Sequence, residues 1–235
     1  RGGYSGLGFG LHNEIVAPYI LHYGTEAQKQ RILPKMATGE WVGAIAMTEP
    51  DYGSDVASLT LRADRVEGGW SLTGAKTWCT FAGKAGVLMV VARTDPDRSL
   101  GHKGLSLMLV EKPSTEDHAF RVDQPKGGVL AGRAIPTLGY RGMHSYDLAF
   151  ENWWVPDSHV IGEAAGLGKG FYFNMTGMVG GRMQTAARAC GVMRAALFAA
   201  QQYTRDLRVF GQPLTHYPLT QAKLARMAAR LSVAS

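Results

Sequence analysis

The sequence predicts an α+β protein with more than one domain, and two observations lead to this prediction. The period of the hydrophobic residues changes twice along the chain, and the strand-like segments follow one another with no helices between them. Residues 1–38 have a helical pattern, residues 39–163 a period of two, and residues 164–235 a helical pattern again. We therefore predict a helical N-terminal remnant, a middle β domain, and the first half of a C-terminal four-helix bundle.

The N-terminal region is predicted to contain two short helices. Gly24 ends the first, and Thr25–Gln28 opens the second as a capping box, in which side chains satisfy the free N–H groups of the first turn. The apolar face of this second helix is supplied by Ile32, Leu33 and Met36.

The middle region is predicted to be an antiparallel barrel or sandwich. Alternating apolar residues predict strands over 41–47, 70–73, 87–92 and 105–110. Glu67–Gly69 is a hairpin signal between two strands. Strands this close together argue against a doubly wound sheet, which needs crossover helices.

The C-terminal region is predicted to form two long helices separated by a break at Phe210–Leu214, the second beginning near Leu219. Apolar residues recur every three or four positions along the first helix and predict a buried stripe. The stripe consists of Ala186, Cys190, Met193, Leu197, Ala200 and Tyr203. Two helices make only half a bundle, so we expect an apolar face that further sequence or a partner chain covers.

Composition narrows the class of protein. The 235 residues are 46% hydrophobic and 19% charged, and no apolar run is long enough for a transmembrane helix, so we expect no membrane insertion. The net charge is +6, but Lys and Arg are spread along the chain, which argues against nucleic-acid binding. The chain begins at Arg1 without an initiator Met and ends inside a helical pattern, so we expect a piece of a longer protein.

The cysteines and histidines predict neither disulfides nor a metal site. Cys79 and Cys190 give no framework of bridges, so a reducing compartment, the cytoplasm, is expected. The seven histidines lack metal-ligand spacing.

The glycine-rich runs Gly6–Gly10 and Gly166–Gly170 lack the spacing of a dinucleotide-binding turn, and we interpret both as structural.

Two segments carry the functional signal. Ala46–Asp55 and Gly74–Thr80 each have the pattern of a strand that ends in polar residues. One interpretation is structural: a Pro-Asp turn with Gly53 in the left-handed region, and a core Trp78 followed by a solvated Thr80. The other is that their hydroxyls, free N–H groups and indole bind a flat, electron-poor ring with a phosphate tail.

These segments resemble the flavin-contacting segments of the acyl-CoA dehydrogenase family, which is FAD-dependent. In the first segment Tyr52 stands where the family has a small residue, while the matching positions are Ala46, Met47, Thr48, Glu49, Gly53, Ser54 and Asp55. Arg141–Phe150 resembles the last strand of the family's β domain, and Phe210–Gln212 resembles its turn between helices. The resemblance covers nearly all of the chain in the family's order.

The resemblance implies roles for individual residues. Trp78 would pack against the isoalloxazine ring, and the Thr80 hydroxyl would approach flavin N5, while the Cys79 side chain would point the other way and pack. The full set of implied cofactor-binding residues is Ile45, Met47, Thr48, Gly53, Ser54, Trp78, Cys79, Thr80, Arg208, Phe210 and Gln212. The implied substrate-binding residues are Ser54 and Arg182.

Three departures from the family pattern bear on catalysis and binding. Val179 stands where the family often has an Asp that helps bind substrate, and Gly181 stands where one branch has its catalytic Glu. The resemblance therefore implies that no catalytic residue lies in this chain and that the Glu base lies downstream. Leu207 replaces an Arg of the cofactor-binding turn, for which Arg205 or Arg208 would have to compensate.

The implied reaction is α,β-dehydrogenation of an acyl-CoA thioester, in which a Glu removes the Cα proton and flavin N5 receives the hydride from Cβ. The implied partners are acyl-CoA, an electron-transfer flavoprotein, and further copies of the chain in a homodimer or homotetramer. Two alternatives stay open: a flavin monooxygenase or acyl-CoA oxidase on the same fold, and a non-catalytic member that binds nucleic acid.

Overall fold

The computed structural model describes residues 8–125, 127–139 and 142–235. These residues divide into two compact units, which we call the β unit (residues 8–181) and the helical unit (residues 182–235). One long helix, α3 (Gly170–Asp206), contributes residues to both. Each unit is considered by itself below.

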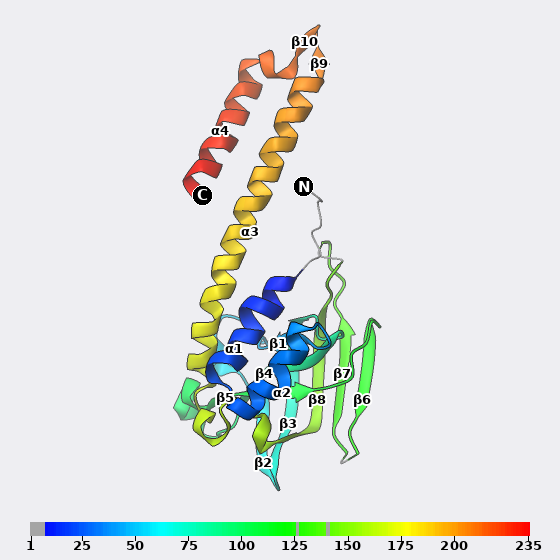
Figure 1. Cartoon of the computed structure of the whole chain (residues 1–235), viewed down its shortest axis with the longest axis vertical. Helices are drawn as coiled ribbons and strands as arrows, with labels where there is room; N and C mark the ends of the chain where they lie inside the picture. Colours follow the sequence, from blue (N-terminus) through cyan, green and yellow to red (C-terminus); the bar gives the residue numbers. More distant parts are fainter. Residues whose placement is uncertain (1–7, 126, 140–141) are drawn as a thin grey trace. The chain divides into compact units, whose positions relative to one another are not determined.

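The β unit is built on one sheet. In the described residues this sheet has eight strands, ordered β1-β4-β2-β3-β8-β7-β6, with β5 paired to β4 (Figure 1). The strands are β1 (Val42–Ala46), β2 (Arg62–Val66), β3 (Gly69–Thr80), β4 (Ala85–Arg93), β5 (Leu105–Glu111), β6 (Ala119–Asp123), β7 (Val129–Ala134) and β8 (Ser145–Pro156). All four predicted strands and the predicted β2–β3 hairpin are confirmed.

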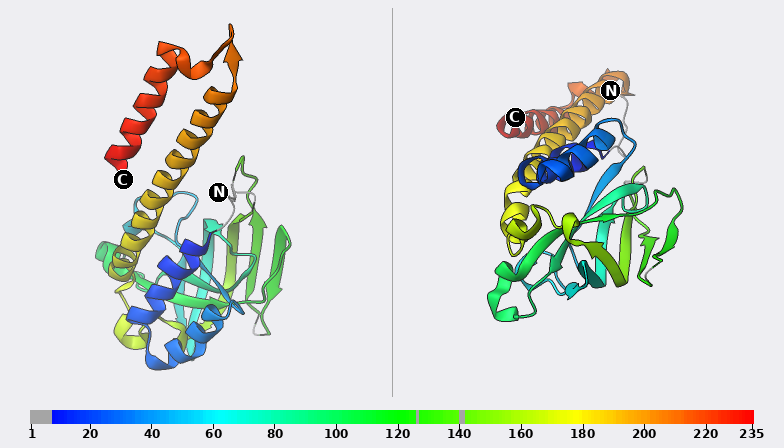
Figure 2. Two further views of the ribbon diagram at one scale, coloured as in Figure 1. Left: turned by 45° about the horizontal axis from the view of Figure 1, so that its top comes forward. Right: turned by 60° about the horizontal axis from the view of Figure 1, so that its bottom comes forward.

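The sheet is mixed, which differs from the wholly antiparallel pairing that we predicted. β1 runs parallel to β4, with Ala44 opposite Leu88, and β2 meets β4 in parallel at Arg62 and Arg93. The reason is that β1, β2 and β4 run in one direction and β3 in the other: the β2–β3 hairpin reverses the chain, and the turn after β3 reverses it again before β4. The other strand pairs are antiparallel, and the sheet curls into a half-barrel (Figure 2).

Two short helices and a preceding π-helical turn cover one face of the sheet (Figure 1). These are η1 (Leu11–Val16), α1 (Ala17–Tyr23) and α2 (Glu26–Ala37). The predicted capping box is confirmed: the Gln28 N–H donates to Thr25 Oγ1, and the Thr25 N–H donates to Gln28 Oε1 at 3.0 Å. Gly24 ends α1 as predicted.

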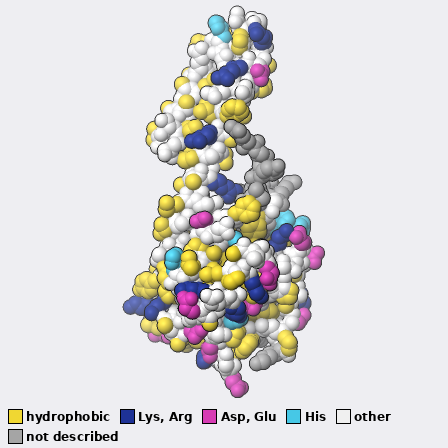
Figure 3. Space-filling model, viewed as in Figure 1, with side chains coloured by type: hydrophobic (Ala, Val, Ile, Leu, Met, Phe, Trp, Pro, Cys, Tyr) yellow, Lys and Arg dark blue, Asp and Glu magenta, His cyan; other side chains and the backbone are white. Residues whose placement is uncertain are grey.

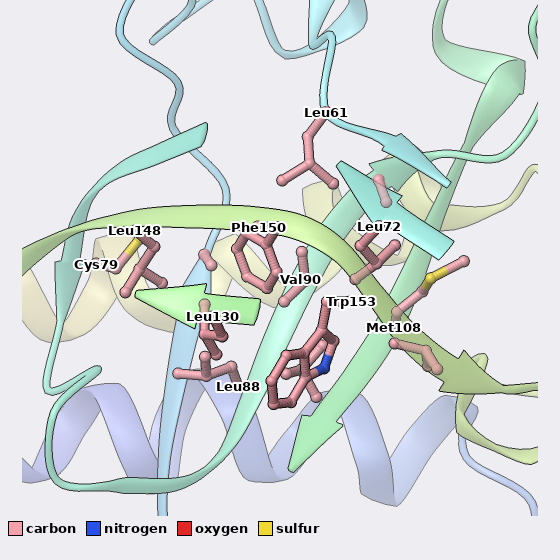
Figure 4. Close-up of a cluster of buried hydrophobic side chains, with 14 of the residues drawn as sticks. Leu61, Leu72, Cys79, Leu88, Val90, Met108, Leu130, Leu148, Phe150 and Trp153 are labelled. Atoms are coloured by element: carbon pink, nitrogen blue, oxygen red, sulfur yellow. The ribbon is translucent and has the colours of Figure 1, made fainter. Parts of the chain in front are cut away.

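The hydrophobic core lies on both sides of β4. Val87, Met89 and Val91 point toward the cluster formed with α1 and α2, which we call the helix-side cluster. Leu88 and Val90 point into a barrel-side cluster with residues of β3, β7 and β8 (Figure 4). Because both faces of β4 are buried, its sequence is an unbroken apolar run rather than an alternating one.

Some connections of the β unit contain short helical turns: η2 (Val56–Ser58), η3 (Arg98–Gly104), η4 (Asp157–His159) and η5 (Glu163–Gly166). The first part of α3 packs closely on η1 and α1 through glycines. A Cβ added at Gly177 would lie 2.4 Å from the ring of Tyr19, and one added at Gly181 would lie 2.8 Å from Ile15 Cδ1. Larger residues at these positions would push the helices apart.

The helical unit consists of the rest of α3, the strands β9 (Arg208–Val209) and β10 (Gln212–Pro213), the turn η6 (Leu214–His216) and α4 (Pro218–Ala234). The predicted break between two helices is confirmed. In the described residues no helix has both the length and the apolar character required to cross a bilayer.

The predicted burial of the stripe on α3 is wrong for this chain. Ala186 and Tyr203 are exposed, and Cys190, Met193, Leu197 and Ala200 are only half-buried. Hydrophobic side chains therefore lie at the surface of the helices, as Figure 3 shows. The apolar pattern is present, but α4 covers only part of it, which agrees with the uncovered face expected of half a bundle.

Candidate functional site

The structure brings the two segments singled out from the sequence side by side. The Thr77 N–H donates to Thr48 O at 2.8 Å. One residue away, Lys76 Nζ donates to Met47 O at 2.9 Å. The polar turn that follows β1 therefore lies against the C-terminal end of β3.

A β-bulge in β3 determines which side chains face outward at this point. Lys76 pairs with Leu148 and Cys79 pairs with Tyr146, so three steps along β3 match two steps along β8. The extra residue lets Lys76 and Cys79 both point inward, whereas regular alternation would place them on opposite faces. Trp78 consequently points outward, and its indole is 58% exposed.

Trp78 also adopts a strained backbone conformation, with φ at +57°. The left-handed region is unfavourable for bulky residues, and such residues concentrate at functional sites. An exposed indole also forgoes the burial that usually stabilises Trp. The alternative of a core Trp is therefore wrong, and the local geometry places a flat aromatic surface at the exterior of the β unit.

The Trp78 indole borders a pocket of about 330 Å³. The described residues that line it are Trp78, Thr80, Thr137, Gly139, Met143 and Ser145. Thr80 Oγ1 and Ser145 Oγ are 2.9 Å apart and share a hydrogen bond. Sequence reasoning missed Ser145, because only the register of β3 on β8 places it opposite Thr80.

A buried ion pair that the sequence analysis also missed holds the two segments together. Lys76 Nζ lies 2.9 Å from Glu49 Oε1, and the two side chains are 0% and 3% exposed. The Glu49 carboxylate also accepts hydrogen bonds from the backbone N–H groups of Thr60 and Leu61 and from the Thr60 hydroxyl. The sequence did contain a signal for the buried lysine: Lys76 lies an even number of residues from Trp70 and Leu72, so all three share the inward face of β3.

These contacts shift the pKa values of both Glu49 and Lys76. Burial by itself raises the pKa of Glu49, but the Lys76 ammonium and the hydrogen bonds from Thr60 and Leu61 outweigh it, so the pKa lies below its ordinary value. Burial lowers the pKa of Lys76, and the Glu49 carboxylate opposes that shift. The pair thus fixes the Met47 carbonyl and the start of the polar turn.

The polar turn itself is exposed at Gly53 and Ser54 and is closed by hydrogen bonds between the backbones of Glu49 and Tyr52. The structural interpretation of this turn is wrong in placing Gly53 in the left-handed region, because Gly53 is not among the positive-φ glycines of the described residues. A Cβ built on Gly53 meets no described atom within 4 Å, so the fold of this chain does not require glycine there. Close approach of a ligand would require it. Tyr52, the departure from the family pattern, packs against the helix-side cluster.

Three other residues predicted to contact the flavin, Ile45, Met47 and Cys79, are half-buried or buried in the β unit. The Ile45 and Met47 side chains are half-buried and pack against the helix-side cluster, where Asn174 Nδ2 donates to Met47 Sδ. Cys79 is 1% exposed in the barrel-side cluster, and burial raises its pKa to about 12. The packing role expected for the Cys79 side chain is confirmed, and its assignment as a cofactor-binding residue stays a prediction.

The remaining predicted residues belong to the helical unit. Phe210 is 94% exposed at the turn between β9 and β10, with φ at +49°. Arg208 Nη1 donates to Gly211 O at 3.3 Å, and Arg182, Arg205 and Gln212 are exposed. The structure thus gathers the residues of the predicted nucleotide-binding turn on one hairpin.

The donors present at the Trp78 pocket fit the isoalloxazine ring of FAD. An exposed indole offers a stacking surface, and two hydroxyls at its edge offer hydrogen bonds to ring heteroatoms. The same residues do not fit a metal ion, and in the described part of the chain no group of three His, Cys, Asp or Glu side chains is placed to bind one.

Helical segments that precede and follow a β half-barrel in the sequence, with an aromatic surface at a strand end, define a class of multidomain α+β proteins. Comparison with known proteins gives the family. The chain matches the N-terminal domain of acyl-CoA dehydrogenases over residues 1–40, the middle domain over residues 44–153 and the C-terminal domain over residues 168–235. The chain belongs to the acyl-CoA dehydrogenase family, which is FAD-dependent.

Individual relatives agree with this assignment. Isovaleryl-CoA dehydrogenase, mitochondrial, of Solanum tuberosum is 37% identical over 96% of this chain and 50% of its own length. An acyl-CoA dehydrogenase of Geobacillus kaustophilus is 34% identical with a TM-score of 0.86, covering 97% of this chain and 57% of that one. The glutaryl-CoA dehydrogenase of Mycobacterium smegmatis in complex with FADH2 is 29% identical with a TM-score of 0.79, covering 95% and 52%. The chain thus spans about half the length of these relatives.

Proposed function

We propose that the protein containing this chain catalyses FAD-dependent α,β-dehydrogenation of an acyl-CoA thioester. The observation that carries the proposal is the strained, exposed indole of Trp78 beside the Thr80–Ser145 hydroxyl pair, in a chain of this family. FAD, when bound, supplies the two-electron acceptor.

In the proposed site, residues of the β unit hold and orient the cofactor. The Trp78 indole packs against the flavin ring, and the Thr80 hydroxyl hydrogen-bonds to the ring nitrogen that receives the hydride. The Thr48 hydroxyl and the neighbouring amides bind the pyrimidine edge. Gly53 and Ser54 lie near the phosphate-bearing portion or the substrate.

Residues of the helical unit are proposed to act on substrate and on a neighbouring copy of the chain. Arg182 binds near the acyl-CoA thioester, and Phe210, Gln212 and Arg208 bind FAD held by another protomer of a homodimer or homotetramer. Because Gly181 stands where one branch of the family has its Glu, we assign proton removal to a Glu outside this chain. An electron-transfer flavoprotein is the proposed electron acceptor.

The domain boundaries and the location stay proposals as well. We place the boundaries after residues 38 and 163. The cytoplasmic location rests on cysteine content alone, and the isovaleryl-CoA relative from Solanum tuberosum is named as mitochondrial.

The test uses the purified full-length protein and its Trp78→Ala and Trp78→Phe variants. We expect wild type to retain FAD and to be bleached by an acyl-CoA thioester, with electrons passed to an artificial acceptor. Trp78→Ala should weaken FAD binding by about tenfold through loss of ring contact, and Trp78→Phe should restore most of it.

A colourless full-length protein that ignores added FAD would overturn the proposal. Rapid reaction of the reduced protein with oxygen would favour the oxidase or monooxygenase alternative. Steeply salt-dependent DNA binding, without flavin reduction by any acyl-CoA, would favour the nucleic-acid alternative.

A further inference from the structure

The Thr80–Ser145 pair is held rigidly at the edge of the Trp78 pocket. The two residues are direct partners in the β3–β8 pairing. On either side of the pair, the Phe81 N–H donates to His144 O at 2.9 Å and the Ile135 N–H donates to Ser145 O at 2.8 Å. The backbone therefore fixes both Cα positions, and the hydroxyl hydrogens are the parts of the pair that can reorient.

A hydrogen bond between two hydroxyls can run in either direction. Each hydroxyl has one hydrogen to donate and two lone pairs to accept with. If Ser145 donates to Thr80, the Thr80 hydrogen is free to point into the pocket. If Thr80 donates to Ser145, a Thr80 lone pair faces the pocket instead. The 2.9 Å separation allows both arrangements.

We propose that Ser145 is a positioning residue that lets Thr80 act as a hydrogen-bond donor in one redox state of the cofactor and as an acceptor in the other. This inference rests on the proposed function. A ring nitrogen without a hydrogen needs a donor, whereas the same nitrogen carrying a hydrogen needs an acceptor. Rotation of the two O–H bonds supplies either one, and no proton leaves Thr80 or Ser145.

Removing the Ser145 hydroxyl has a defined consequence. Without Ser145 as acceptor, the Thr80 hydrogen loses its partner when Thr80 must accept from the ring, so the reduced state is weakened more than the oxidised state. We expect Ser145→Ala to shift the two-electron equilibrium against the reduced form by about three- to tenfold, the worth of one neutral hydrogen bond. That shift lowers the midpoint potential by about 15 to 30 mV.

The experiment measures the midpoint potential and the visible absorption spectrum of bound FAD in the full-length protein. Ser145→Ala should lower the potential and shift the flavin absorption bands, and Ser145→Thr, which keeps the hydroxyl, should restore both. In a Thr80→Ala background, Ser145→Ala should have no further effect, because Ser145 acts through Thr80.

Ser106→Ala is the matched control. Ser106 Oγ forms a similar pair with Thr94 Oγ1 at 2.7 Å in the same unit, but neither residue lines the Trp78 pocket. We expect this variant to lower the thermal midpoint without moving the potential of bound FAD. A merely structural role for Ser145 would give the same result as the control.

The outcomes separate this inference from the proposed function. If wild type binds no FAD, the proposed function fails. If wild type is reduced by acyl-CoA but Ser145→Ala leaves the potential unchanged, or shifts it equally in the Thr80→Ala background, only the role of Ser145 is overturned. Should Ser145→Ala not fold, Ser145→Cys replaces it as a weaker hydrogen-bonding variant, and an unchanged potential there overturns the inference.

Discussion

Both units contain apolar patterns, yet β4 buries its pattern within the described residues and the stripe on α3 does not. All nine residues of β4 are buried, because the sheet curls and the helices α1 and α2 cover its other face. On α3, the stripe from Ala186 to Tyr203 is exposed or half-buried. The difference shows that a sequence pattern predicts which face of an element is apolar, but not what covers it.

Two phenylalanines give the largest contrast between the units. Phe150 on β8 is 2% exposed in the barrel-side cluster, whereas Phe210 in the helical unit is 94% exposed. We expect Phe150→Ala to lower the free energy of unfolding by about 3–5 kcal/mol through a core cavity. Phe210→Ala should lower it by less than about 0.5 kcal/mol. Urea denaturation followed by circular dichroism measures both.

The Phe210→Ala variant also tests the proposed role of Phe210 in binding FAD. If Phe210 serves the FAD of a neighbouring protomer, Phe210→Ala should release FAD while leaving the fold intact. A loss of stability from Phe210→Ala as large as that from Phe150→Ala would show that this hairpin is a structural element.

The buried ion pair gives an expected effect of the same size as that of Phe150→Ala. Lys76→Met leaves the Glu49 carboxylate buried without its cation, and we expect a loss of about 3–5 kcal/mol. The control is Lys29→Met, which breaks the more exposed pair with Glu26 on α2 and should cost less than about 1 kcal/mol. Similar thermal midpoints for the two variants would contradict the structural importance assigned to the Glu49–Lys76 pair.

Contacts between segments that are distant in sequence mark the limit of what the sequence could predict. The strands, the capping box and the break between α3 and α4 follow from local periodicity and turn residues, so they were predictable. The bulge at Trp78, the parallel β1–β4 pair and the Ser145 partner depend on register between segments distant in sequence. A pattern of period two indicates which face a side chain takes, but not which residue of a distant strand it pairs with, so these features needed the structure.

The packing around α3 differs between two of its glycines, and substitution of each glycine by Ala tests this difference. Gly177 has no room for a methyl group against the Tyr19 ring, whereas a Cβ at Gly191 meets no described atom within 4 Å. We expect Gly177→Ala to destabilise the protein by about 1–3 kcal/mol through overpacking. Gly191→Ala should stabilise α3 by up to about 1 kcal/mol, because Ala is the better helix former.

Thermal midpoints of the full-length variants measure both effects. Stabilisation by Gly177→Ala would show that α3 does not approach α1 as closely as the structure indicates. Destabilisation by Gly191→Ala would show that a partner or further sequence packs on this part of α3, which would then resemble the β unit in being fully covered.

The last expected effect is a change of stability with pH, and it concerns a buried lysine of the β unit. Lys112 Nζ donates to Gly83 O at 2.7 Å and to Pro113 O at 2.8 Å, and it lies 4.5 Å from the centre of the Phe120 ring. Burial lowers the pKa of Lys112 from 10.5 to about 8. Between these two pH values the unfolded chain binds more protons at this position than the folded chain, so the contribution of Lys112 to stability rises with pH.

Lys112→Met should remove that rise. We expect the difference in urea midpoint between wild type and Lys112→Met to change in favour of wild type from pH 8 to pH 10 and to be flat from pH 6 to pH 7. Lys84→Met, which removes a half-exposed lysine paired with Glu116, serves as the control and should show no such change. A flat difference for Lys112→Met across the whole range would mean that its ammonium is solvated, and that the β unit is less completely covered at this edge than β4 is.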